Sequence, residues 1–311
     1  MNRWRLPTLV ATAPPLDDPE AWTRLRAALI DALDVGYRAI RLHAQHYDPR
    51  LDALLEPVIR RGLHTQLALG AGAIIQALDA GPGTVLDATM WLVELPGDGQ
   101  TDLVLTEASA ALERLAQRGL RRGLSVSLTK TRARDLEATA TLAAQQLCSL
   151  LVICSGVSGS HDLPDELERS MAYVTARRAG RESSALRIEI DLHEREGLAR
   201  WFATSLSSSV PLTCMLPTLV ISGTGQVDPL RAGITGFSLG TLEQAALVQL
   251  LARWRTACAA RWVALGRATI TRVGRVDAWP VVDWPAELAA CATSMLRAHP
   301  THAAESPRRA P

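Results

Sequence analysis

Lysine is almost absent from this chain. Lys130 is the single lysine among 33 basic residues, and 32 acidic residues leave a formal net charge of +1. Such a balance gives no overall field that would attract nucleic acid or an anionic membrane. The arginines beside Trp254 and Trp262 are therefore interpreted as solvated groups that flank two tryptophan anchors. We expect no nucleic-acid partner and no membrane partner.

Long apolar runs and paired cysteines are also missing. The N-terminal stretch contains only a short, interrupted apolar run, which fits neither a secretion signal nor a membrane span, so a cytoplasmic location is expected. The five cysteines form no CxxC pair and are scattered along the chain, at Cys148, Cys154, Cys214, Cys258 and Cys291. This spacing argues against a disulfide framework and a zinc-ribbon site, and favours isolated buried thiols.

The apolar content is high enough to bury a full core. It amounts to 48% of 311 residues, and one large domain is favoured. Short β-branched runs alternate with amphipathic stretches, which is typical of β-α units around a parallel sheet. Strands are predicted at residues 6–12, 38–43, 64–69, 90–95, 124–129 and 150–155. Helices are predicted at residues 19–33, 48–61, 71–78, 106–118 and 134–146.

The alternation changes after the sixth predicted strand. A helix that ends near Gly180 and a strand at residues 185–192 are predicted next. Residues 216–254 then combine a short apolar strand, a glycine-bounded hairpin and an amphipathic helix that carries a tryptophan. The last residues, from Ala298 on, are rich in proline, arginine and small residues and are predicted to be disordered.

Several of these segments resemble the radical S-adenosylmethionine superfamily. Gly36 and Tyr37 match the family's turn before its second strand, and residues 48–51 match the start of the helix that follows. Residues 136–154 are similar to the fifth helix and sixth strand. Residues 216–254 look like the C-terminal region of peptide-modifying members, the SPASM module. The resemblance extends over most of the chain.

The resemblance implies an α/β fold and a biosynthetic role. The implied fold is a partial TIM-type (β/α)6 barrel over residues 1–197, a SPASM-like helical and hairpin extension over residues 198–297, and a disordered tail over residues 298–311. Enzymes of the family hold a [4Fe-4S] cluster through three thiolates and bind S-adenosylmethionine. Relatives often act on ribosomal peptides, so a peptide substrate and a partner biosynthetic enzyme are the expected partners.

The chain departs from the family where the cofactors bind. The loop that corresponds to the family's CxxxCxxC motif, residues 13–22, contains no cysteine. The family's GGEP stretch is represented by residues 43–49, which contain neither glycine nor glutamate, and Cys214 is the thiol that directly precedes the SPASM-like residues 216–254. These departures predict a pseudoenzyme, for which no cofactor is expected, neither the [4Fe-4S] cluster nor S-adenosylmethionine.

Polar residues follow several predicted strands, whose carboxyl ends form the catalytic edge of a barrel. His43 and His46 are candidates for metal binding without an identified third ligand, Glu94 and Asp98 for acid–base work, and Lys130 for a Schiff base. The alternative for the two histidines is a substrate contact or a plain structural role. For Glu94 and Asp98 it is a solvated loop, and for Lys130 a solvated basic rim or an anion contact. The catalytic candidates are His43, His46, Glu94 and Lys130. The binding candidates are His43, His46, Tyr47, Glu94, Asp98, Ser155, Ser158 and His161, with no metal site.

Three functional hypotheses follow. The first is a cluster-less binding or accessory subunit in peptide (RiPP-type) or small-metabolite biosynthesis. The second is an enzyme that uses the barrel mouth for non-radical chemistry. The third is a true radical S-adenosylmethionine enzyme with non-standard cluster ligands such as Cys148 and Cys154.

Overall fold

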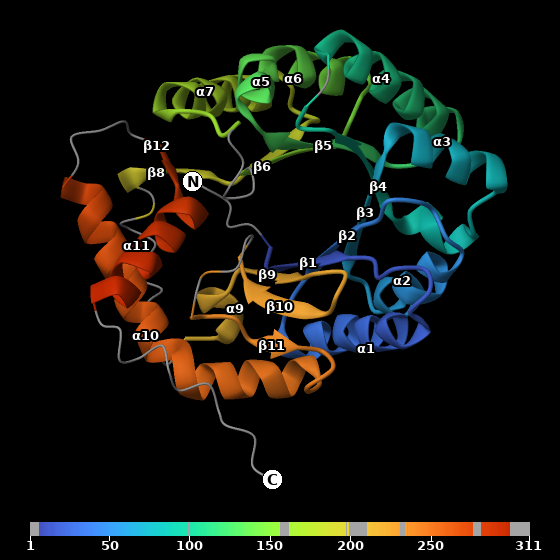
Figure 1. Ribbon diagram of the computed structural model, residues 1–311. Helices are drawn as coiled ribbons and strands as arrows, with labels where there is room; N and C mark the ends of the chain where they lie inside the picture. Colours follow the sequence, from blue (N-terminus) through green and yellow to red (C-terminus); the bar gives the residue numbers. More distant parts are fainter. Residues whose placement is uncertain are drawn as a thin grey trace.

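A large, mainly parallel sheet organises this mixed α/β chain (Figure 1). The computed structural model describes residues 6–98, 100–155, 162–196, 198, 210–230, 234, 236–275 and 281–298. Within them, ten strands form one sheet in the order β11-β10-β9-β1-β2-β3-β4-β5-β6-β7. The strands from β1 to β7, together with β9, run parallel, whereas β10 and β11 are antiparallel to their neighbours. Their bounds are β1 (Thr8–Thr12), β2 (Ala39–His43), β3 (His64–Gly70), β4 (Met90–Leu95), β5 (Arg122–Leu128), β6 (Leu150–Ser155), β7 (Arg187–Ile190), β9 (Thr218–Ile221), β10 (Gln226–Pro229) and β11 (Gly240–Thr241).

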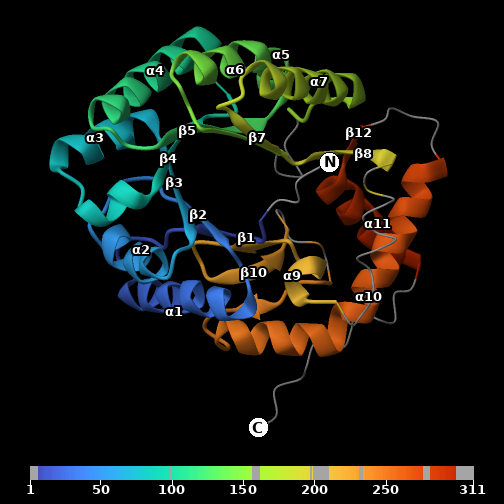
Figure 2. The same ribbon diagram turned by 180° about the vertical axis from the view of Figure 1, so that it is seen from behind.

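Helices surround the outer side of this sheet (Figures 1 and 2). Those of the N-terminal part are α1 (Pro19–Val35), α2 (Arg50–Arg60), α3 (Ala71–Ala80), α4 (Thr101–Gln117), α5 (Lys130–Arg134), α6 (Leu136–Gln145) and α7 (Glu166–Glu182), with the short 3-10 helix η1 (Thr84–Ala88). The C-terminal part adds α9 (Leu212–Met215), α10 (Leu247–Arg275), α11 (Trp284–Ala298) and a two-stranded sheet of β8 (Leu192–Glu194) and β12 (Val281–Asp283). Because α10 packs against α1, the C-terminal part covers the sheet beside its first strand. In the part of the chain described, no helix is long and apolar enough to cross a membrane.

The first β-α unit shows how the sequence sets these elements. Asp18 caps α1 by accepting a hydrogen bond from the Ala21 N–H, and Pro19 occupies the first helical position. The helix ends at Gly36, whose φ of 107° is left-handed and suits glycine. The buried Tyr37 hydroxyl then donates to the Leu216 carbonyl, 3.0 Å away, so this turn joins the C-terminal part to the N-terminal core.

The tryptophans of α10 anchor it to the core, as their spacing predicted. Trp254 donates from its indole nitrogen to the Phe237 carbonyl at 2.9 Å, and Trp262 donates to the Met215 carbonyl at 3.2 Å. Both side chains are buried.

Alternation along the strands divides the side chains between two faces. The main core, between the sheet and the helices, contains residues such as Leu9, Ile40, Leu67 and Trp91. On the inner face lies a second, smaller apolar cluster, formed by Ala68, Leu92, Leu150, Val152 and Cys154. The inner face is therefore packed by its own side chains in its middle part.

A buried ion pair crosses the inner face. Arg41 on β2 contacts Glu189 on β7 at 2.8 Å, and their side chains are only 7% and 12% exposed. Gln66 accepts a hydrogen bond from Arg41 at 2.7 Å, and Arg187 is a second partner of Glu189 at 2.9 Å. Four strands separate β2 from β7 in the sheet order, so the sheet must curve strongly to bring these two side chains together.

The seven predicted strands of the N-terminal part and the glycine-bounded hairpin are confirmed, and the α/β class with them. Two helices differ from their predictions. The helix predicted at residues 106–118 begins at Thr101, and the one predicted at residues 134–146 is divided into α5 and α6 at Asp135. Thr129 caps α5 by accepting from the Arg132 N–H, which starts a helical turn before the predicted one.

We predict that Glu189→Gln lowers the free energy of unfolding by about 3 kcal/mol, because it leaves a buried guanidinium without its counter-charge. Urea unfolding followed by circular dichroism measures the change. Glu137→Gln is the control, since its pair with Arg178 is exposed and should contribute less than about 1 kcal/mol. Equal losses in the two variants would contradict the bracing role of Glu189.

Candidate functional site

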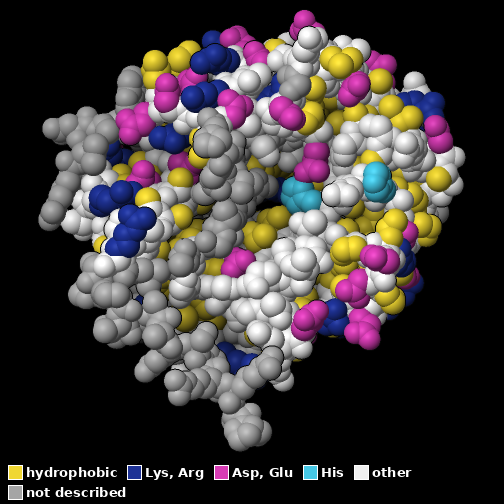
Figure 3. Space-filling model, in the orientation of Figure 1, with side chains coloured by type: hydrophobic (Ala, Val, Ile, Leu, Met, Phe, Trp, Pro, Cys, Tyr) yellow, Lys and Arg dark blue, Asp and Glu magenta, His cyan; other side chains and the backbone are white. Residues whose placement is uncertain are grey.

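A pocket of about 710 Å³ opens at the carboxyl ends of the central strands. The strands contribute inward-facing side chains that include Val10, Thr12, His43, Glu94, Ser125 and Ser127. The turns after β3 and β4 form another wall, and Val104, Glu107 and Ala108 of α4 line the far side. Figure 3 shows a histidine and an acidic side chain beside a hollow on this face. The volume lies within the range of small-molecule sites.

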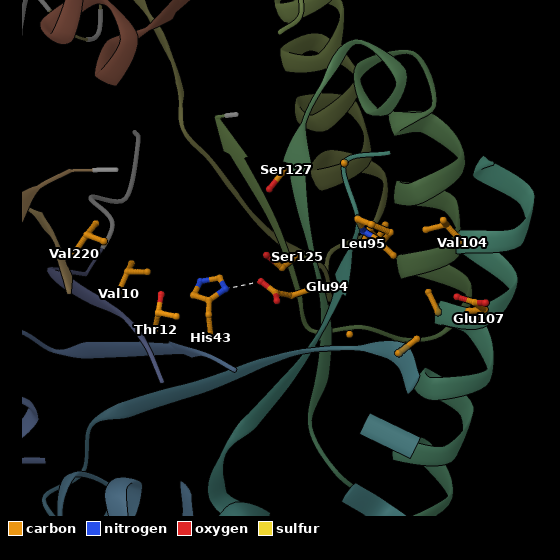
Figure 4. Close-up of a pocket in the computed structure, with 15 residues that line it drawn as sticks. Val10, Thr12, His43, Glu94, Leu95, Val104, Glu107, Ser125, Ser127 and Val220 are labelled. Atoms are coloured by element: carbon orange, nitrogen blue, oxygen red, sulfur yellow. Dashed lines mark hydrogen bonds and ion pairs between the residues drawn. The ribbon is translucent and has the colours of Figure 1, made fainter. Parts of the chain in front are cut away.

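His43 and Glu94 form the central polar contact of the pocket. His43 Nδ1 is hydrogen-bonded to the Glu94 carboxylate, and Figure 4 shows the two side chains facing each other from β2 and β4. Their side chains are 19% and 34% exposed. His43 Nε2 is buried and has no hydrogen-bond partner among the described residues. With Nδ1–H donating to a carboxylate, Nε2 keeps its lone pair, so the imidazole is oriented to accept a proton or a hydrogen bond.

A buried arginine fixes the wall after β4. Arg132 is 1% exposed and donates to the carbonyls of Pro96 and Asp98, each at 2.8 Å. Thr129 Oγ1 donates to the Gly97 carbonyl at 2.8 Å. A Cβ at Gly97 would lie 2.9 Å from the Thr129 methyl group, so glycine permits this close approach. The pocket wall is therefore held from α5 and the strand end before it.

Of the residues proposed from sequence, the structure brings together His43 and Glu94. His46 is exposed and, like Tyr47, Asp98, Lys130 and Ser155, does not line the pocket. Ser158 and His161 lie outside the described residues.

The other candidates have structural contacts of their own. The Tyr47 hydroxyl donates to the Asp52 carboxylate at 3.2 Å. Burial is the main cause that raises the pKa of Tyr47, and the negative charge of Asp52 raises it further. The backbone N–H of Lys130 donates to the Asp162 carbonyl, and that of Ser155 to the Asp191 carboxylate. The side chain of Asp98 is exposed, and its carbonyl is held by Arg132.

Sequence reasoning missed four polar residues of the pocket. Ser125 and Ser127 alternate with apolar residues in β5, a period-two pattern that could have placed both hydroxyls on the inner face. Thr12 at the end of β1 follows the same rule. Glu107 gave no signal, because it stands inside an ordinary amphipathic helix.

Comparison with known proteins gives similarity in fold alone. No protein-family model matches the chain, and no curated protein matches it significantly. Among solved structures, SuiB from Streptococcus suis bound to its precursor peptide SuiA is similar with a TM-score of 0.52 and 12% identity, over 81% of this chain and 65% of SuiB. SuiB bound to S-adenosylmethionine gives 0.51 and 13%, over 80% and 66%. The protein anSMEcpe, with bound AdoMet and the Cp18Cys peptide, gives 0.50 and 10%, over 87% and 86%.

The resemblance to radical S-adenosylmethionine enzymes is thereby confirmed in the fold. This chain spans about two thirds of the length of SuiB. The expectation of no cofactor is wrong: both similar proteins bind S-adenosylmethionine, and radical S-adenosylmethionine enzymes carry iron–sulfur clusters. A missing sequence motif removes particular ligands, but it leaves the cavity between the strand ends in place.

The thiols of the described residues do not fit the three ligands of a [4Fe-4S] cluster. Cys148 precedes β6 and Cys154 lies within it, six residues later, which corresponds to about 20 Å of extended chain. Cys214, Cys258 and Cys291 lie on α9, α10 and α11. No group of three or more His, Cys, Asp or Glu side chains that could hold a metal ion occurs within the described ranges.

Thiol labelling tests this placement. Burial raises the pKa of Cys148 to about 12, whereas Cys214 is exposed. We predict that iodoacetamide at pH 8 labels Cys214 in the native protein at least about 100 times faster than Cys148, because the thiolate is the reactive form. Mass spectrometry of tryptic peptides measures both rates, and labelling in urea provides the unfolded reference. Comparable native rates would show that Cys148 is not held in the core.

Proposed function

We propose that this chain acts as a binding or accessory subunit in peptide maturation of the RiPP type or in small-metabolite biosynthesis. The main support for this proposal is the pocket at the carboxyl edge of the sheet, which brings together His43, Glu94 and three hydroxyl groups. None of its described lining residues is a cysteine. The similar fold of SuiB, which is bound to the precursor peptide SuiA, supports a peptide as the ligand. The chemistry of maturation would then belong to a partner enzyme.

The proposal includes an architecture. Residues 1–197 would form a partial TIM-type barrel, and residues 198–297 a SPASM-like extension. The ion pair between β2 and β7 supports the barrel curvature, and the antiparallel strands β10 and β11 support a distinct C-terminal module attached beside β1. The tail predicted to be disordered lies, from residue 299 on, outside the described residues.

S-adenosylmethionine is a second candidate ligand of the same pocket, because proteins of similar fold bind it. The pocket is large enough for it, and the hydroxyls of Thr12, Ser125 and Ser127 match the hydrogen-bonding needs of a ribose. When bound, this cofactor would supply an electrophilic sulfonium group.

A non-radical enzyme is the second candidate function, and the contact between His43 and Glu94 favours it. A carboxylate that fixes the tautomer of an imidazole is a common arrangement for general base catalysis. Radical catalysis by this chain is the third candidate. It needs non-standard cluster ligands such as Cys148 and Cys154, since all five cysteines of the sequence lie within the described residues.

Blocking the pocket tests the binding role. We predict that Ser127→Trp abolishes retention of peptides from a random amidated library, because an indole at the end of β5 would fill the space between the strand ends. Thr106→Trp is the control on the exposed side of α4. Peptides eluted from the immobilised proteins are counted by mass spectrometry. Equal retention by the wild type and Ser127→Trp would overturn peptide binding at this pocket.

Anaerobic reconstitution with iron and sulfide separates the binding role from radical catalysis. Less than about one iron per chain and no sulfide-to-iron charge-transfer band would favour the binding role. About four irons per chain with that band would favour the third candidate. Calorimetric titration of the same samples with S-adenosylmethionine reports whether the cofactor binds independently of iron.

A further inference from the structure

The ionisable groups that line the pocket give it a negative charge. Among the described residues these are Glu94, Glu107 and His43, and the described lining contains neither lysine nor arginine. Two carboxylates with a neutral imidazole carry −2, and with a protonated imidazole they carry −1. The sign of the charge is therefore the same in either state of His43. Figure 3 agrees, since the Lys and Arg side chains drawn on this face lie away from the hollow.

Lys130 and Arg132, at the start of α5, do not neutralise this charge. The Arg132 guanidinium lies behind the pocket wall and is used to hold the carbonyls of Pro96 and Asp98. Lys130 does not line the pocket. Glu107 is exposed on α4 and forms no ion pair with any residue that the structure describes. Its carboxylate is available to a ligand.

The rest of the lining favours an aliphatic stem. Val10 and Val220 lie on one side of His43, and Leu95 and Val104 lie on the other side, near α4 (Figure 4). Ala108 of α4 also lines the pocket. Such walls bury methylene groups while carboxylates receive a polar head, which is how long basic side chains are accommodated. A carboxylate or phosphate ligand would instead meet like charge.

We infer that this pocket receives a cationic side chain of a peptide, the ammonium group of lysine or the guanidinium group of arginine. Glu94, which His43 orients through its hydrogen bond, supplies the counter-charge beside His43, and Glu107 supplies another on the α4 side of the pocket. The inference rests on the proposed peptide-binding function and adds the class of residue that the pocket selects. A small free amine has the same chemistry and is separated from a peptide by experiment.

The test compares acetylated and amidated pentapeptides that carry lysine, arginine, norleucine or glutamate between flanking glycines. Saturation-transfer NMR and calorimetry measure their affinities, with agmatine as the free cation. We expect the lysine and arginine peptides to bind at least about tenfold more tightly than norleucine, and the preference to weaken as salt is raised from about 50 to 500 mM. Agmatine alone should bind more weakly than the peptides.

Isosteric variants locate the selectivity. Glu94→Gln and Glu107→Gln should each reduce the preference for lysine over norleucine by about threefold or more, because each removes one counter-charge and keeps the side-chain shape. Glu113→Gln is the matched control, since Glu113 is also exposed on α4 but lies outside the pocket. An unchanged preference in both pocket variants would overturn the inference.

The outcomes distinguish the two proposals. Equal or tighter binding of the norleucine or glutamate peptide overturns the cation preference and leaves peptide binding intact. Binding of agmatine without any peptide supports the cation site and overturns the peptide proposal. If no probe binds, both are wrong.

Discussion

The contact between Arg41 and Glu189 is the constraint on which the shape of the inner face depends. It joins β2 to β7 across the concave side of the sheet, although four strands lie between them. Removing two charges from water is costly, so such a pair tolerates little separation once it is buried. A flatter sheet would separate the two side chains and leave the Arg41 guanidinium without its counter-charge, whereas Glu189 would keep Arg187. The pair thus specifies curvature more than it adds stability.

The inner face changes character along the strands. The ion pair and Gln66 occupy one part, an apolar cluster around Leu92 and Val152 fills the middle, and the pocket with His43 and Glu94 opens beyond it. Cys154 belongs to the apolar cluster, which explains a thiol on the inner face without a ligand role. Since the apolar cluster lies between them, the two polar regions of the inner face are separated within the described residues.

Small residues in β5 create the volume of the pocket. Gly123, Ser125 and Ser127 follow one another on its inner face. At Gly123 a Cβ would lie 2.4 Å from the Leu150 carbonyl oxygen, so only glycine allows β5 and β6 to approach there. The two serines continue the row with side chains too short to fill the space between the strand ends. The alternation of side chains along β5 therefore produces both the close approach of β5 to β6 and the open volume of the pocket.

The strands of the N-terminal part could be predicted because each is a local pattern of apolar and β-branched residues. The start of α4 could not, because Thr101 and Asp102 continue a loop in the sequence and become helical only where Thr101 meets Asp135 and Arg132. His43 and Glu94 were candidates by their place at strand ends, but their contact depends on strand order and register. The pairing of Arg41 with Glu189 had no local signal, since 148 residues separate the two positions. The expectation that no cofactor binds was wrong because it depended on short cofactor-binding motifs. The fold was predicted from the spacing of apolar residues along the chain, which does not depend on those motifs.

The position of β1 has a consequence for synthesis on the ribosome. This strand pairs with β2 on one side and with β9 on the other, and β9 is more than 200 residues later in the chain. Until residue 221 leaves the exit tunnel, the nascent sheet presents β1 as an open edge with unpaired backbone groups. In the interval between translation of the two strands, this open edge can pair with the edge of another chain, which makes edge-to-edge aggregation a hazard of that interval.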